Sequence, residues 1–237
     1  MKHKEWMIVA ALCIVVCVAL VAAVLTVTGG RTDVIADRAA TSFNALLQAA
    51  PALMDGDPTN GWSLTSPDGG ARFAWFGRDM SGNSAGMRIA FDAAPFVAAG
   101  LDLAALPATY TVADGWLGIG AAPAMGGGEP VPATPLEAYG RVIEGQPSLL
   151  GYHTPMDHFG VNLGNGNLFE WAQDLAVNVN TGAAQDKDAV FVLNPEPLIA
   201  AGADPQAVAG WAYAQVPVME NGGSTLVYKF LKPIDIQ

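Results

Sequence analysis

Two histidines lie close together in the segment His153-Thr-Pro-Met-Asp-His158, with Asp157 directly before the second. Imidazole nitrogens and carboxylates bind zinc, and the same groups act as acid and base in hydrolysis. His153, Asp157 and His158 are therefore candidate metal ligands. The structural alternative is a helix start, in which Thr154-Pro155 forms the N-cap and first turn and Asp157 falls at the third position.

A second candidate metal site lies in the segment Asp55-Gly-Asp57-Pro-Thr-Asn60-Gly61. Asp55, Asp57 and Asn60 alternate along it as hard oxygen ligands do in a calcium loop. Ser66 occupies the twelfth position, however, where such a loop carries a bidentate glutamate. The alternative is an ordinary polar turn, so the sequence predicts no cofactor, and Ca²⁺ is retained only as an alternative at this loop.

Aromatic residues supply the third candidate site. Gly70-Ala-Arg-Phe73-Ala-Trp75 is similar to Gly166-Asn-Leu-Phe169-Glu-Trp171, 96 positions further along the chain. Aromatic side chains at a spacing of two lie on one face of a strand, where they usually fill a core. In the alternative interpretation, Phe73, Trp75, Phe169 and Trp171 form related ligand-binding surfaces, one per copy of the motif.

A second repeated motif follows the first in the same order. Pro95-Phe-Val-Ala-Ala-Gly-Leu-Asp102 is similar to Pro197-Leu-Ile-Ala-Ala-Gly-Ala-Asp204, and the offset is 102. The six-residue difference matches a polar insertion at 177–187, as expected for a longer loop. Coincidence in a chain rich in Ala and Gly is the alternative to duplication.

The elements that position these residues follow the same order in each copy. Apolar residues at steps of three and four predict a helix ending before Pro51, and Thr134-Pro-Leu-Glu137 is a capping box that begins another. A hairpin, a strand, a short helix and one or more strands follow each helix. We therefore predict an α+β fold made of two related units, 31–120 and 134–237, joined by a linker of Gly, Pro and Ala at 121–133.

The N-terminus differs from the rest of the chain. Residues 7–28 (MIVAALCIVVCVALVAAVLTVT) contain no charge and are long enough to cross a bilayer as one helix. Lys2 and Lys4 precede this run, so the positive-inside rule places the N-terminus in the cytoplasm. Residues 1–30 are thus predicted to be a cytoplasmic stub and a single-pass signal-anchor. A cleaved signal peptide, a lipoprotein signal and a buried soluble helix are the alternatives.

Composition limits the functions of the remaining residues. The net charge is −11, and the stretch from Arg31 onward holds all but one of the 22 Asp and Glu. Nucleic acid and anionic lipid bind through clustered Lys and Arg, so neither is expected as a partner of this acidic domain. Both cysteines, Cys13 and Cys17, lie in the apolar N-terminal run, which excludes disulfides and thiol zinc sites elsewhere.

Three functions remain open. The sequence favours a membrane-anchored, extracytoplasmic binding or envelope-interaction module, with the bilayer contacted through residues 7–28. A carboxylate-based envelope hydrolase is the second hypothesis, because two acids brought together by folding suffice for such chemistry. The third is a single-pass accessory subunit bound to a partner protein of a membrane complex.

Overall fold

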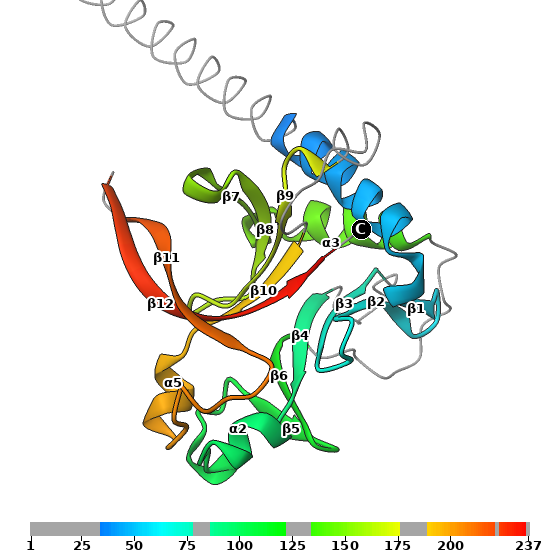
Figure 1. The fold of residues 1–237 in the computed structure, drawn as a ribbon. Coiled ribbons are helices and arrows are strands. Elements are labelled where there is room, and N and C mark those ends of the chain that lie inside the picture. The colour runs from blue at the N-terminus through cyan, green and yellow to red at the C-terminus, as the bar shows by residue number, and fades with distance from the viewer. Residues whose placement is uncertain (1–33, 78–85, 122–133, 176–188, 221–222, 236–237) are drawn as a thin grey trace, which may run out of the picture. The chain divides into compact units, whose positions relative to one another are not determined.

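The strands form two six-stranded antiparallel sheets (Figure 1). The computed structural model describes residues 34–77, 86–121, 134–175, 189–220 and 223–235. In the first sheet the strand order is β1-β2-β3-β4-β6-β5, and in the second it is β11-β12-β10-β9-β8-β7. The first sheet comprises β1 (Met54–Asp57), β2 (Gly61–Thr65), β3 (Ala71–Phe76), β4 (Gly86–Asp92), β5 (Thr111–Ala113) and β6 (Trp116–Gly120). The second comprises β7 (Leu150–His153), β8 (His158–Asn162), β9 (Leu168–Ala172), β10 (Ala189–Leu193), β11 (Ala212–Glu220) and β12 (Gly223–Ile234).

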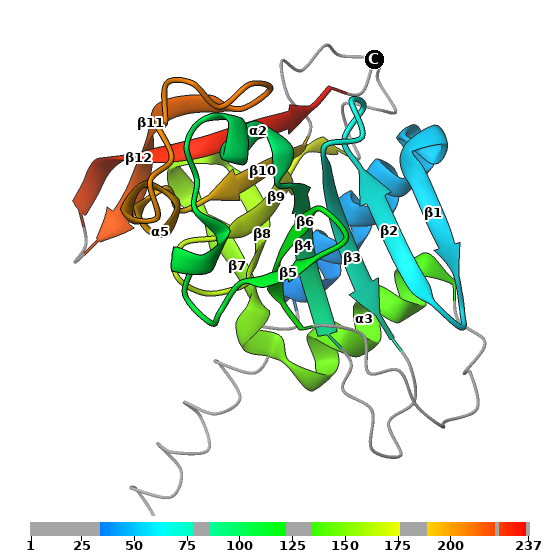
Figure 2. The same ribbon diagram turned by 90° about the horizontal axis from the view of Figure 1, so that it is seen from below.

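Helices are short and few in the described chain. Residues 34–49 are helical, and the other α-helices are α2 (Ala94–Ala98), α3 (Pro135–Gly145) and α5 (Glu196–Ala200). Single 3₁₀ turns occur at Pro51–Leu53, Leu103–Ala105, Pro147–Leu149 and Thr154–Met156. The capping box predicted at Thr134 is confirmed, with Glu137 bonding back to the Thr134 backbone. Helix α3 then runs beside β2 and β3 (Figure 2).

Aromatic side chains from the two sheets meet in the core. Phe73 of β3 and Phe169 of β9 stack with ring centroids 4.4 Å apart and planes inclined by 7°. Phe43, from the helical segment before Pro51, fits beside Phe73 and also contacts Trp75 and Trp171. These rings are completely buried, so the alternation of aromatic residues along β3 and β9 fills the interior.

The two halves of the chain have the same topology. If β1 is matched with β7, β2 with β8 and so on to β6 with β12, the strand order of the first sheet is the same as that of the second. Trp62 pairs with Trp75 across β2 and β3, and Phe159 pairs with Trp171 across β8 and β9. Residues 39–237 nevertheless form one compact unit, so the boundary between units at 121–133 stays a prediction.

The loops after α2 and α5 bind each other reciprocally. The Asp102 amide donates to the Ala201 carbonyl, and the Asp204 amide donates to the Ala99 carbonyl, both at 2.7 Å. Gly100 and Gly202 lie at this contact with φ near +100°. A Cβ at Gly100 would lie 2.9 Å from the Gly202 carbonyl oxygen, so this approach requires glycine.

The predicted α+β class is wrong, because the described chain is mostly β-sheet. The reason is that segments interpreted as loops or helix starts are edge strands. Asp55 and Asp57 lie on β1, and His153 ends β7. The Thr154–Met156 segment is a single 3₁₀ turn, after which Asp157 takes a left-handed conformation and ends it. The long ribbon of β11 and β12 adds further strand (Figure 1).

The single-pass membrane-helix prediction also requires correction. None of the helices in the described ranges is long and apolar enough to span a bilayer. The residues on which that prediction rested, 7–28, lie outside the described part of the chain. The described residues form a β-rich domain.

Candidate functional site

A pocket of about 300 Å³ opens on the face of the second sheet that points away from the aromatic core. Side chains of alternating residues share a face of a strand, so two valines of β10 and two of β11 reach the pocket together. We call it the histidine pocket. It is lined by His153, Met156, His158, Leu168, Glu170, Val190, Val192, Val216, Val218, Lys229 and Leu231.

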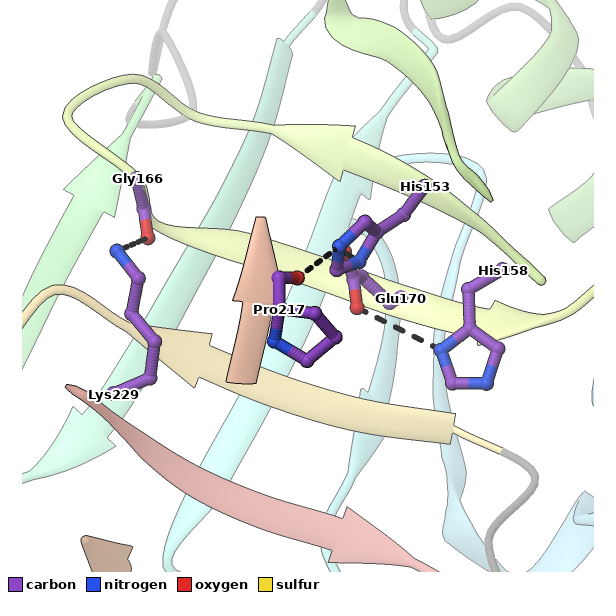
Figure 3. Close-up of polar contacts among 6 residues, drawn as sticks. All are labelled: His153, His158, Gly166, Glu170, Pro217 and Lys229. Atoms are coloured by element: carbon purple, nitrogen blue, oxygen red, sulfur yellow. Dashed lines mark hydrogen bonds and ion pairs between the residues drawn. The ribbon is translucent and has the colours of Figure 1, made fainter. Parts of the chain in front are cut away.

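Three polar side chains meet at one part of this pocket (Figure 3). His153 Nδ1 lies 3.0 Å from Glu170 Oε1, and His158 Nδ1 lies 3.6 Å from Glu170 Oε2. The Glu170 side chain is only 5% exposed. Glu170 lies on β9, and both histidines flank the turn between β7 and β8. The hairpin therefore folds two imidazoles over one buried carboxylate.

His153 also bonds to the opposite edge of the sheet. Its Nε2 lies 2.6 Å from the Pro217 carbonyl oxygen on β11. A carbonyl oxygen and an ionised carboxylate both accept hydrogen bonds, so both ring nitrogens of His153 must carry protons. His153 is therefore an imidazolium. The hydrogen bond from His153 to Glu170 raises the pKa of His153, which opposes the lowering by burial.

Glu170 is held as a carboxylate by the same contacts. Burial alone raises its pKa, but the hydrogen bond from His153 and the neighbouring imidazoles reverse that effect and lower the pKa. His158 Nδ1 is buried without a hydrogen-bond partner, because 3.6 Å exceeds hydrogen-bonding range. The pair of His153 and Glu170 is thus internally neutral, and His158 Nδ1 lies beside it at 3.6 Å from Glu170 Oε2.

Lys229 supplies the remaining charge of the pocket. Lys229 is 9% exposed, and its Nζ donates to the Gly166 carbonyl oxygen at 3.1 Å (Figure 3). Among the described residues, no carboxylate lies within 4.0 Å of this ammonium group. Burial lowers the pKa of Lys229, although Glu196 and Glu170 oppose this at longer range. A buried cation with a single carbonyl partner is a costly arrangement.

The structure does not unite the predicted metal ligands around one point. His153 uses both nitrogens, and Asp157 accepts from the Tyr152 hydroxyl and from Gln173 Nε2. No group of three or more His, Cys, Asp or Glu side chains that could hold a metal occurs within the described ranges.

The calcium candidate and the histidine segment occupy equivalent hairpins of the two sheets. Asp57 pairs with Gly61 at the end of β1, as His153 pairs with His158 at the end of β7. Asp57 Oδ1 accepts from the Thr59 and Asn60 amides, and Oδ2 accepts from Asn60 Nδ2. Asp55 accepts from the Gly56 amide. These contacts are those of a polar turn.

The four predicted aromatic residues lie in the core. Phe73, Trp75, Phe169 and Trp171 are all 0% exposed. Trp75 Nε1 donates to the Pro135 carbonyl oxygen at 2.8 Å, whereas Trp171 Nε1 is buried without a partner. Their rings pack against one another and against Phe43, so they present no face to a ligand.

Sequence analysis missed Glu170 and Lys229, the two charges that define the pocket. Each stands in an apolar strand sequence, Leu168-Phe-Glu-Trp-Ala172 and Val227-Tyr-Lys-Phe-Leu231. Strand alternation puts Glu170 on the face opposite Phe169 and Trp171, and Lys229 on the face opposite Phe230. Curvature of the second sheet buries that face, and no local pattern in the sequence reports curvature.

The chain matches no protein-family model, no curated protein and no solved structure. The chemistry of the histidine pocket is therefore argued from its own residues. They provide apolar walls, a neutral pair of His153 and Glu170, and the Lys229 ammonium group, which has no carboxylate within 4.0 Å among the described residues.

Proposed function

We propose that this protein is a binding module for a small, mostly apolar molecule that carries one anionic group. The observation that carries the proposal is Lys229, a buried ammonium group at an apolar pocket with a backbone carbonyl as its partner. A ligand carboxylate at Lys229 would offset the cost of burying that charge. The histidine pocket would serve as the ligand site.

The walls of the pocket favour an apolar ligand body. Val190, Val192, Val216 and Val218 face the hollow from neighbouring parts of the curved sheet. Covering such side chains stabilises a complex by roughly 25 cal/mol per Å² of apolar surface removed from water. A volume of about 300 Å³ lies at the lower end of ligand pockets, so a small ligand fits best.

Electrostatics favours an anion over a cation. Glu170 is paired with the His153 imidazolium, so its charge is already compensated. Lys229 retains a positive charge that no carboxylate within 4.0 Å balances in the described chain. An anionic group therefore gains more at Lys229 than a cationic group gains at Glu170.

Binding accounts for this site better than carboxylate hydrolysis. Glu170 is the one acid among the residues that line the histidine pocket, and glycoside cleavage requires two. His153 has both nitrogens engaged and offers no lone pair as a base. Location outside the cytoplasm and contact with envelope proteins stay predictions, because residues 1–33 lie outside the described chain.

Calorimetric titration of the purified full chain with hexanoate, octanoate, decanoate and octanol tests the proposal. We expect saturable binding of a carboxylate and about tenfold weaker binding of octanol.

Val218→Trp fills the pocket and should abolish binding, whereas Val112→Trp, on the exposed edge strand β5, should not. Lys229→Met should bind octanoate and octanol alike. Wild-type protein that binds none of these compounds, or V218W protein that binds them normally, would refute the ligand class.

A further inference from the structure

A second pocket, of about 400 Å³, lies on the first sheet. Its floor includes two small residues of the central strands, Ala74 and Ala90, and Ala90 pairs with Gly118 of the next strand, β6. The long side chains of Arg72 and Arg88 rise beside this floor. Small residues between two long cationic side chains leave a hollow there, which we call the arginine pocket.

Arg88 is held in place by residues of β6 and β5 beside the pocket. Its guanidinium lies over Gly118, where a Cβ would collide with Nη2, Nε and the central carbon. Nη2 donates to the Thr111 hydroxyl on β5. Nε is buried and has no hydrogen-bond partner. A donor held rigid, buried and unsatisfied is costly unless a ligand accepts from it.

Arg72 brings a second guanidinium to the same pocket. It lies 5.2 Å from the ring centroid of Trp116, which holds the side chain by a cation–π contact. Within the described ranges, neither Arg72 nor Arg88 has a carboxylate within 4.0 Å. Asp55 and Asp114 also line the pocket, and Asp55 bonds instead to the Gly56 amide.

The lack of carboxylate partners for Arg72 and Arg88 within the described ranges is unexpected in an acidic chain. Its 22 Asp and Glu outnumber its 11 Lys and Arg, so carboxylate partners for surface arginines are plentiful. Arg88 Nη2 donates to Thr111, but with no carboxylate within 4.0 Å in the described part of the chain, the two guanidinium groups keep other donors for a ligand. Guanidinium groups match oxyanions in geometry, since their N–H bonds can donate in parallel to two oxygens.

We infer that the arginine pocket binds the oxyanion group of a small molecule, with Arg88 and Arg72 as its donors. Phosphate, sulfate and carboxylate groups share this chemistry. Gly118 is a positioning residue, because its missing side chain admits the Arg88 guanidinium. The inference is independent of the histidine pocket, which lies on the other sheet and uses Lys229.

Calorimetric titration of the full chain with inorganic phosphate, sulfate, acetate and phenyl phosphate tests the inference and ranks the oxyanions. We expect saturable binding of at least one, weakened about tenfold or more by Arg88→Gln and by Arg72→Gln. Arg141→Gln, on the exposed side of α3, removes the same charge elsewhere and should leave affinity within about twofold. A preference for phenyl phosphate over inorganic phosphate would indicate an aromatic contact with the ligand.

Gly118→Ala separates geometry from charge. It keeps both arginines, displaces the Arg88 guanidinium, and should weaken binding as much as R88Q does. Circular dichroism of each variant establishes that it is folded, and Arg88→Lys provides a milder substitution if R88Q unfolds. Absence of saturable binding by the wild-type chain would overturn the inference. Equal loss of affinity in R141Q and R88Q would also overturn it, because general charge would then explain binding.

Discussion

The imidazole of His153 donates from Nε2 to the Pro217 carbonyl oxygen at 2.6 Å and so joins the two edge strands of the second sheet. Edge strands otherwise present unpaired backbone groups. Because β7 and β11 stand at opposite ends of the strand order, this bond links the two edges of the curved sheet at the histidine pocket. The same imidazolium neutralises Glu170 on the pocket wall.

The stability of the fold should therefore depend on the protonation of His153. The pKa of His153 is raised above its ordinary 6.5, so its contribution is complete below pH 6.5 and is lost as pH rises through the raised pKa. The pKa of Glu170 is lowered below 4.5, so its contribution is lost only as pH falls through the lowered value. The pair of His153 and Glu170 should therefore stabilise the fold fully between the ordinary pKa values of the two groups, 4.5 and 6.5.

Urea unfolding between acidic and alkaline pH measures this dependence. His153→Gln should cost about 1–3 kcal/mol at mildly acidic pH and remove the fall in stability toward alkaline pH. His158→Gln is the matched control, since His158 Nδ1 makes no hydrogen bond, and it should retain that fall. An unchanged pH slope in H153Q would contradict the assigned imidazolium.

Two lysines of β12 should respond oppositely to removal of their charge. Lys229 has a carbonyl partner alone, so Lys229→Met should be neutral or stabilise the fold by about 1 kcal/mol. Lys232 pairs with Asp68 and lies 5.3 Å from the Trp211 ring centroid, so Lys232→Met should cost about 1–2 kcal/mol. Chemical denaturation at neutral pH compares them. Destabilisation of K229M as large as that of K232M would argue against an unpaired cation.

The reciprocal glycine contact should be intolerant of a methyl group on either side. Gly100→Ala and Gly202→Ala each force a residue with φ near +100° against the facing carbonyl oxygen and should cost about 1–3 kcal/mol. The double variant should cost less than the sum, because both substitutions open one contact. Gly140→Ala, in α3 with free space around its Cβ position, is the control and should be neutral or stabilising. Thermal unfolding measures all four, and strict additivity would show the two sites to be independent.

The equivalent tryptophans of the two halves should differ in the cost of losing the indole N–H. Trp75→Phe leaves the Pro135 carbonyl oxygen without its donor, whereas Trp171→Phe removes a buried N–H that has no partner. We expect W75F to be the more destabilising by about 1–2 kcal/mol. Equilibrium denaturation of both variants checks this, and a larger loss in W171F would contradict the assigned hydrogen bond.

Several features follow from the sequence by local physics. The capping box at Thr134 begins α3 because its side-chain and backbone bonds all lie within four residues. The spacing of two puts Phe73 and Trp75 on one face of their strand, and likewise Phe169 and Trp171. These four side chains fill the core. Local chemistry was sufficient there. It was insufficient for β1 and β7, whose short sequences MDGD and LGYH show no clear strand pattern and become strands by pairing with β2 and β8.

The pocket itself was decided by tertiary structure. His153 and Glu170 are 17 residues apart in sequence, and His153 and Pro217 are 64 apart. They meet because the second sheet curves until its edges approach, and strand alternation does not encode that curvature. Sequence alone therefore determined that Phe73, Trp75, Phe169 and Trp171 face the core. Only the folded sheet determined that Glu170 and Lys229 are buried charges, because burial depends on what the rest of the chain places above them.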